Sequence, residues 1–347
     1  MTSARVTTSA ATLFKKVPRL QTLAGVAFLK AAHAGSQDIH TLMKKDAPIE
    51  DALQEALQFL CHQLLQHIVY GEQTRAEEML KENPPLLFYL LFSPATVEDY
   101  SGRTLTGTAM QLAYGAQDAE MCDMLLGYFD QLEKGREEAL RQIREEFPEG
   151  QPTAAAFNFN SILQAIKNAS DQAVQNALTH VQDTSSLSQA LDNFREAFTA
   201  LSLQEGSHFN PRHWLEALTV YDREFDHFKD RKQRDLFWRQ VVGYVQRYLS
   251  SCYAQAVAQG IYYIVDEHEA LRRSFDFRDG DGVFYPISAS PSGLGYDYAD
   301  GTWGVCWASQ ERGAASLVTE IVSRKNRELV ELMPRAQHST MRCCTLL

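Results

Sequence analysis

The stretch that decides the fold of the first half of the chain is residues 97–113, VEDYSGRTLTGTAMQLA. Residues 97–104 are rich in turn-forming side chains, a composition suited to a hairpin-like finger. Residues 108–113 then open a helix, and Asp118 can cap a second helix directly after it. The stretch therefore predicts a finger followed by a pair of helices.

A second helix pair is predicted just before the finger. Apolar residues recur at three- and four-residue steps and give one apolar stripe, formed by Leu53, Ala56, Leu57, Leu60, Leu64 and Ile68. Gly71 ends this helix. Thr74, with Glu77 three residues later, has the pattern of a capping box for the next helix. That helix ends at Asn83-Pro84-Pro85, because proline cannot continue it.

These residues resemble a known family. Gly102-Arg103-Thr104, Thr108-Ala109-x-x-Leu112-Ala113, Asp118 and Met124-Leu125-Leu126 resemble an ankyrin repeat, and residues 67–80 resemble a degenerate repeat before it. The usual Pro-Leu-His step is missing, and residues 105–107 are inserted. At most two repeats are visible, over about residues 53–130. Because about three solenoid units are needed to bury their faces, we expect this pair to lean on neighbouring helices.

Together with residues 272–277 (RRSFDF) and 292–297 (SGLGYD), the stretch is similar to ankyrin-like effectors that Legionella injects through its type IV (Dot/Icm) secretion system. This resemblance implies a bacterial protein that acts inside a host cell and binds a host protein. The contact surface it implies is the finger, with Tyr100, Gly102 and Arg103, together with the adjoining helix faces.

We expect a mainly α fold, with ankyrin-like helix pairs, a helical bundle and a small α+β region near the C-terminus. The expected units are a basic N-terminal segment and helix (1–50), the ankyrin-like region (51–131), a helical region (132–260), the α+β region (261–333) and a flexible tail (334–347). In the α+β region, aromatic runs and Asp-Gly or Ser-Gly turns predict two or three short strands over residues 275–307. A helix over 314–332 follows, and Pro334 opens the tail.

The charge of the chain disfavours some partners. With 33 Lys and Arg against 44 Asp and Glu, the formal net charge is -11, which repels nucleic acid and anionic membranes alike. We therefore expect no nucleic-acid partner. The longest apolar stretch near the start, residues 23–34, is too short to span a bilayer. Any attachment to a membrane needs another source.

The last four residues provide a means of membrane attachment, since Cys344-Thr345-Leu346-Leu347 matches a prenylation box. Prenyl transfer requires a cysteine four residues from the carboxyl end, residues that fit an apolar groove and a last residue that selects the lipid. A terminal leucine favours geranylgeranyl over farnesyl. We therefore predict that a host prenyltransferase of the geranylgeranyl type modifies Cys344 and attaches the protein to a host membrane.

Two further features favour such attachment, because one lipid chain alone binds a membrane only marginally. Cys343 is a candidate for palmitoylation. Basic residues over 324–342 outnumber Glu328 and Glu331 and would strengthen binding to an anionic leaflet; these are Arg324, Lys325, Arg327, Arg335 and Arg342.

An enzyme is the alternative to a binding protein. Residues 304–308, GVCWA, are similar to the segment around the nucleophile of papain-like proteases. A cysteine nucleophile needs a histidine to lower its pKa and a third group to orient that histidine. Cys306 with His268 could form the pair of a hydrolase or transferase, with Asp266 or Asp297 as orienter. A buried cysteine in a hairpin is the competing interpretation, and we expect a binding protein.

No cofactor and no metal are predicted. The acidic residues around Asp279 lack the acidic ligand at the twelfth position of a calcium loop, where Ser290 stands. His268-Glu269 lacks the second histidine of a zinc protease motif, since Arg272 occupies its place. Gly293-x-Gly295 lacks the third glycine of a dinucleotide loop.

The N-terminus leaves the localisation open. Residues 1–37 hold five basic residues and no acidic one, and they are rich in Ser, Thr and Ala. That composition is typical of a mitochondrial transit peptide. The expected localisation is the bacterial cytoplasm before secretion and host membranes afterwards, with the mitochondrion as the alternative.

Overall fold

The computed structural model describes residues 47–151, 154–181, 183–206, 208–278, 284 and 313–338. These residues form a mainly helical fold with one small antiparallel sheet, which confirms the predicted fold class. Two hydrophobic cores organise them, which we call the N-terminal core and the bundle core.

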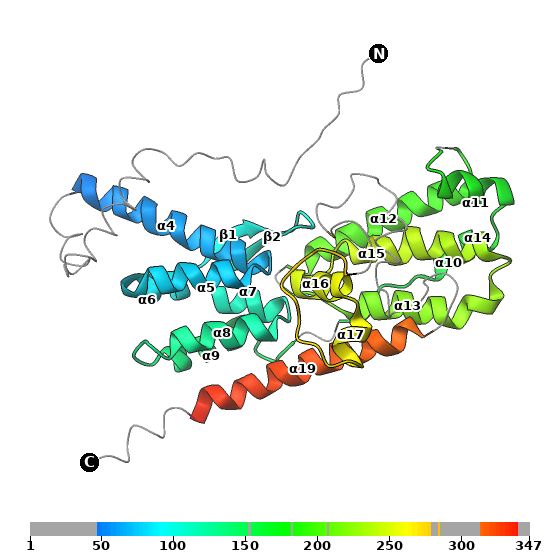
Figure 1. Cartoon of the computed structure of the whole chain (residues 1–347). Coiled ribbons are helices and arrows are strands. Elements are labelled where there is room, and N and C mark those ends of the chain that lie inside the picture. The colour runs from blue at the N-terminus through cyan, green and yellow to red at the C-terminus, as the bar shows by residue number, and fades with distance from the viewer. Residues whose placement is uncertain are drawn as a thin grey trace.

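The N-terminal core is built from helix pairs and one hairpin (Figure 1). The predicted finger is present as an antiparallel hairpin, and the predicted helix pair follows it directly. The elements are α4 (Ala47–Val69), α5 (Gln73–Glu82), the 3-10 turn η1 (Pro84–Leu86), α6 (Leu87–Phe92), β1 (Ala95–Glu98), β2 (Thr104–Gly107), α7 (Ala109–Gly115), α8 (Ala119–Phe129) and α9 (Gly135–Glu146).

Local capping explains where the helix pair after the finger begins. Thr108 accepts a bond from the backbone of Gln111, whose side chain accepts from the backbone N–H of Thr108 in return. Asp118 caps α8 by accepting from the N–H of Met121, as its position predicts. The capping box predicted at Thr74 is wrong, because α5 begins at Gln73, two residues before the start that a Thr74 cap would give, and no side chain caps it.

The bundle core is formed by the helices from α10 onward. They are α10 (Asn160–Lys167), α11 (Asp171–Leu178), α12 (Ser186–Gln204), α13 (Arg212–Glu224), the 3-10 turn η2 (Phe225–His227), α14 (Arg231–Phe237), the π-helix η3 (Trp238–Val242), α15 (Gly243–Gln246), α16 (Ser251–Gln259) and α17 (Ile261–Val265). Of the strands predicted over 275–307, all but residues 275–278 and 284 lie outside the described residues.

Helix α16 joins the bundle to the N-terminal core by satisfying the last carbonyls of α4 and α7. The Ser251 hydroxyl donates to the Val69 carbonyl (2.6 Å), and the Ser250 hydroxyl donates to the Ala116 carbonyl (2.7 Å). Gly71 allows this approach, because its φ is +65° and a Cβ there would lie 2.8 Å from that of Ser251. Carbonyl groups at the ends of these helices, which would otherwise need water as a hydrogen-bond donor, are thus bonded within the protein.

The last helix, α19 (Ala314–His338), connects the two cores. Ala314, Val318 and Ile321 belong to the bundle core, whereas Leu329 and Leu332 belong to the N-terminal core. Figure 1 shows α19 running along one side of the molecule, from the bundle to the outer end of the N-terminal helices. With α9 it contacts α8, so the helix pair α7–α8 packs against neighbouring helices.

The predicted end of α19 is corrected by the structure. The helix continues through Pro334 to His338, although the sequence predicts that this proline opens the tail. A proline inside a helix costs about 3 kcal/mol, and the packing of Leu329 and Leu332 on the N-terminal core holds the preceding turns in place against that cost.

Candidate functional site

The tip of the finger is held by a buried ion pair. The Asp99 carboxylate accepts bonds from the backbone N–H groups of Ser101 (2.9 Å) and Arg103 (3.0 Å). It also accepts from the Arg103 guanidinium at 2.8 Å, and the side chains of Asp99 and Arg103 are only 8% and 5% exposed. Such a multiply bonded charged pair fixes the turn in one geometry.

The neighbouring Tyr100 is also engaged inside the molecule. Its ring stacks on Tyr70 with 4.0 Å between centroids and meets the edge of Phe275 at 5.2 Å. Among the three predicted contact residues, Gly102 alone is exposed. The expectation that Arg103 presents a surface for a partner is therefore wrong, because its charge is buried against Asp99.

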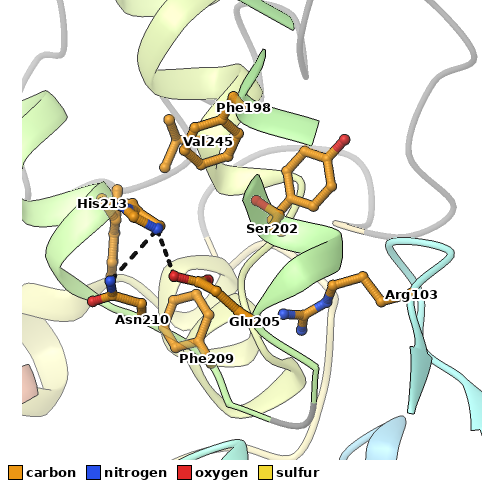
Figure 2. A pocket seen from close by; sticks show the side chains of 10 residues that line it. Arg103, Phe198, Ser202, Glu205, Phe209, Asn210, His213 and Val245 are labelled. Atoms are coloured by element: carbon orange, nitrogen blue, oxygen red, sulfur yellow. Dashed lines mark hydrogen bonds and ion pairs between the residues drawn. The ribbon is translucent and has the colours of Figure 1, made fainter. Parts of the chain in front are cut away.

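Arg103 reaches instead a small cavity between the finger and the bundle (Figure 2). The cavity measures about 10 Å³, which is space for about one water molecule. Its polar walls include Arg103 from the finger, Ser202 and Glu205 from α12, and Asn210 and His213 at the start of α13. Figure 2 shows the Arg103 side chain pointing towards Glu205.

The hydrogen bonds of His213 decide what this cavity can do. Its Nδ1 accepts from the backbone N–H of Phe157 (2.9 Å), which places the imidazole proton on Nε2, and Nε2 donates to Glu205 (2.8 Å). Both ring nitrogens are thus occupied. Although Ser202 lines the same cavity, His213 has no nitrogen left to activate its hydroxyl, as a nucleophilic site requires. The arrangement positions the finger against the bundle.

His208, just before α13, is buried beside this region, and its Nδ1 lies 3.1 Å from the side-chain oxygen of Gln151. Its Nε2 has no partner among the described residues. Burial, reinforced by the nearby Arg103 charge and only partly opposed by Glu205, lowers the pKa of His208 to about 4. The imidazole is therefore neutral at physiological pH.

A second polar cluster lies where α8, α19 and the loop after α17 meet. The Arg273 guanidinium binds both carboxylate oxygens of Asp118, at 2.8 and 2.6 Å, and also Gln73 at 2.7 Å. Burial alone would raise the pKa of Asp118, but Arg273 outweighs it and holds that pKa below its usual value. The carboxylate that caps α8 thus also ties the N-terminal core to the loop.

Lys325 of α19 belongs to the same cluster. Its side chain is 4% exposed, and its ammonium lies 3.0 Å from the Glu120 carboxylate at the start of α8. Burial pushes the pKa of Lys325 down, but the surrounding negative groups outweigh it and the pKa is raised. Lys325 is therefore charged and acts as an internal bond between α19 and α8.

The structure describes the side chains of three of the five basic residues predicted to face a membrane. Lys325 is buried, Arg324 pairs with Glu328 at 2.9 Å, and Arg327 pairs with Glu320 at 3.3 Å. Only Lys325 is thus removed from the surface, whereas the pairs of Arg324 and Arg327 are surface pairs of small energy. The side chains of the other two, Arg335 and Arg342, lie outside the described residues.

The remaining predicted site residues are dispersed or lie outside the described residues. His268 is exposed, in the left-handed conformation (φ +56°) just after α17. Cys306, Cys343 and Cys344 lie outside the described residues, so the pairing of Cys306 with His268 stays a prediction. Within the described ranges, no group of His, Cys, Asp and Glu could hold a metal ion.

The cysteines that the structure does describe are buried and lack reactive character. They are Cys61, Cys122 and Cys252. Burial raises the pKa of each thiol, that of Cys252 to about 12. A thiol is reactive mainly as thiolate, so these three are structural.

Comparison with known proteins adds no assignment: no protein-family model, no curated protein and no solved structure matches this chain. Among the helices that the structure describes, none is both long and apolar enough to cross a membrane.

Sequence reasoning missed the two polar clusters for different reasons. Glu205 and His213 have no motif spacing, and the Phe157 backbone that orients His213 lies 56 positions away. The sequence around Lys325, by contrast, does indicate where its side chain lies. It falls at helical spacing between Ile321 and Leu329, both of which face the cores, so its position on the apolar side of the helix could have been predicted.

Proposed function

We propose that this protein is a translocated bacterial effector that is anchored to host membranes by a geranylgeranyl group on Cys344 and that binds a host protein through its ankyrin-like unit. The observation that carries the proposal is the prenylation box formed by the last four residues, Cys344 to Leu347. The box acts only at a carboxyl terminus, so the anchor requires Leu347 to be the last residue of the natural chain.

The structure supports an anchor that relies on lipid rather than on charge. The net charge of the chain is -11; Lys325 of α19 is buried, and Arg324 and Arg327 each pair with a glutamate of the same helix. One prenyl group alone gives only marginal attachment. Cys343, next to the box, is therefore the proposed site of a second, reversible acyl chain.

The helix before the box limits how far the anchor can lie from the body. α19 packs on both cores and is bound near its middle through Lys325 and Glu120. It ends at His338, six residues before Cys344. A lipid on Cys344 would therefore hold the end of the molecule where α19 terminates close to the membrane.

The proposed membrane attachment is tested in eukaryotic cells with an N-terminal fluorescent fusion. The parent should localise to membranes, and Cys344→Ser should become soluble, because it lacks the thiol that accepts the lipid. Cys343→Ser should weaken attachment without abolishing it. A Cys344→Ser variant that remains fully on membranes would refute the anchor.

Leu347→Ser is the matched control, because a terminal serine redirects the box to farnesyl. This variant should stay on membranes when geranylgeranyl transfer is inhibited, whereas the parent should be released. Deletion of residues 1–37 should leave membrane attachment unchanged; loss of a mitochondrial signal in that deletion would instead support the alternative localisation.

A further inference from the structure

The hairpin has one strand edge whose backbone groups face outward. Asp99 donates its N–H to the Arg103 carbonyl at 3.0 Å, so these two residues form a hydrogen-bonded pair of the antiparallel ladder. Such pairs alternate along the ladder. In the observed register, the next hydrogen-bonded pairs are Val97 with Leu105 and Ala95 with Gly107. Thr104 and Thr106 lie in the alternate pairs, so their backbone N–H and C=O groups point away from β1.

The two edges of the hairpin differ in what covers them. The outer edge of β1 lies along α4, and the Gln66 side chain donates to the Glu98 carbonyl at 2.7 Å. On β2, both Thr104 and Thr106 are exposed. Their backbone N–H and C=O groups have no hydrogen-bond partner among the residues that the structure describes. Thr106 uses its side chain within the hairpin, where its hydroxyl lies 2.8 Å from that of Thr96.

An unpaired edge of this kind is a template for another extended segment. A strand added to β2 would pair with Thr104 and Thr106 through their backbone groups, which gives affinity with little dependence on sequence. Exposed threonines on the same face favour β-branched residues opposite them, since such cross-strand pairs are stabilising.

The charge on that face selects among such segments. Glu98 lies opposite Thr104 in the register and is exposed. Its carboxylate forms no ion pair with any cation in the described part of the chain. Thr104 carries no charge and cannot neutralise it, so a long basic side chain on the added strand, one strand further out on the same face, would do so.

We propose that the outer edge of β2 binds an extended, basic segment of the partner protein as a third strand. This deepens the proposed function and rests on its host-protein binding, but it does not depend on the lipid anchor. The part of the finger that recognises a partner is then the backbone of Thr104 and Thr106, and not the buried Arg103.

The test uses the full unlipidated chain and a fluorescent peptide that alternates valine and threonine and contains two lysines. Binding is measured by fluorescence anisotropy, and protection of the Thr104 and Thr106 amides by NMR-detected hydrogen exchange. We expect saturable binding and slower exchange at those two amides. The same peptide methylated on alternate backbone nitrogens should bind at least tenfold more weakly, and so should one with glutamate in place of lysine.

Two variants separate edge pairing from a general loss of the fold. Thr106→Pro removes an outward N–H, which a proline in an edge strand tolerates, and should weaken peptide binding at least tenfold. Thr106→Val keeps that N–H and should bind like the parent. Glu98→Gln should weaken binding of the lysine peptide severalfold and leave unchanged the binding of a peptide with glutamine in place of lysine.

The proposal is overturned if the lysine peptide fails to bind, or if Thr106→Pro with an intact circular dichroism spectrum binds it normally. It is also overturned if the two amides are already protected without peptide. Protection that disappears on deletion of residues 1–37 would assign the edge to the chain's own basic segment, and protection that rises with protein concentration would assign it to a second copy. None of these results bears on membrane attachment through Cys344.

Discussion

The ion pair between Lys325 and Glu120 should show an unequal response to loss of its two partners. The Lys325 side chain is 4% exposed, whereas that of Glu120 is 37% exposed. Removing the carboxylate in Glu120→Ala leaves a buried ammonium without its bonded partner, and such losses cost about 3–5 kcal/mol. We expect about 3 kcal/mol, at the low end, because the negative charge of Asp118 also acts on Lys325.

The opposite substitution should cost much less. Lys325→Met keeps the apolar stem within the packing of α19 and removes the buried charge, while the partly exposed Glu120 carboxylate remains hydrated. Replacement of a buried charged group by an apolar one of similar volume is often nearly neutral, so we expect a loss within about 1 kcal/mol. As a control, Glu328→Ala breaks the exposed pair with Arg324 and should cost about 0.5 kcal/mol or less.

The assay is urea unfolding of the purified chain, with hydrogen exchange to localise the effect. Glu120→Ala should lower the midpoint most and speed exchange along α19, because that helix is held between the two cores. The reasoning is refuted if Lys325→Met destabilises the protein as much as Glu120→Ala, since the loss of stability would then not arise from an unpaired buried charge.

Three further outcomes are expected. Gly71→Ala should destabilise the fold by about 2 kcal/mol, because the backbone there is left-handed and the added Cβ would crowd α16. Gly127→Ala, with open space at its Cβ, should instead stabilise α8 by about 0.5 kcal/mol. Thermal unfolding of the two variants measures both changes. The pKa of His208 is about 4 in the folded protein, below its ordinary value near 6.5, so the unfolded chain takes up the proton first and stability falls as the pH drops through this window. The loss at pH 5 relative to neutral pH should be about 2 kcal/mol, and His208→Gln should remove this component in urea titrations at both pH values. Asp99→Ala should lower stability by about 3 kcal/mol, because it leaves the Arg103 charge buried and unpaired; equal stability of this variant and the parent would contradict the assignment of Arg103 as an internal residue.

The features predicted correctly from the sequence are local ones. Turn chemistry predicts the hairpin, and the residues Thr108 and Asp118 predict where α7 and α8 begin, because each cap is completed within three residues. The Leu53–Ile68 stripe likewise predicts α4, since periodicity reports which face is buried.

The features missed depend on contacts between distant residues. Arg273 and Asp118 are 155 positions apart, and nothing near either residue indicates the other. The burial of Arg103 follows from the bundle closing over the finger, so its exposure could not be judged from the ankyrin-like pattern alone. Pro334 predicts a helix end only when local propensity is weighed without the tertiary packing that overrides it.

The most direct test of the proposed membrane anchor is mass spectrometry of the C-terminal peptide from protein expressed in eukaryotic cells. The account predicts a single geranylgeranyl thioether on Cys344, present in the membrane fraction and absent from Cys344→Ser. An unmodified Cys344 in protein recovered from the membrane fraction would contradict it.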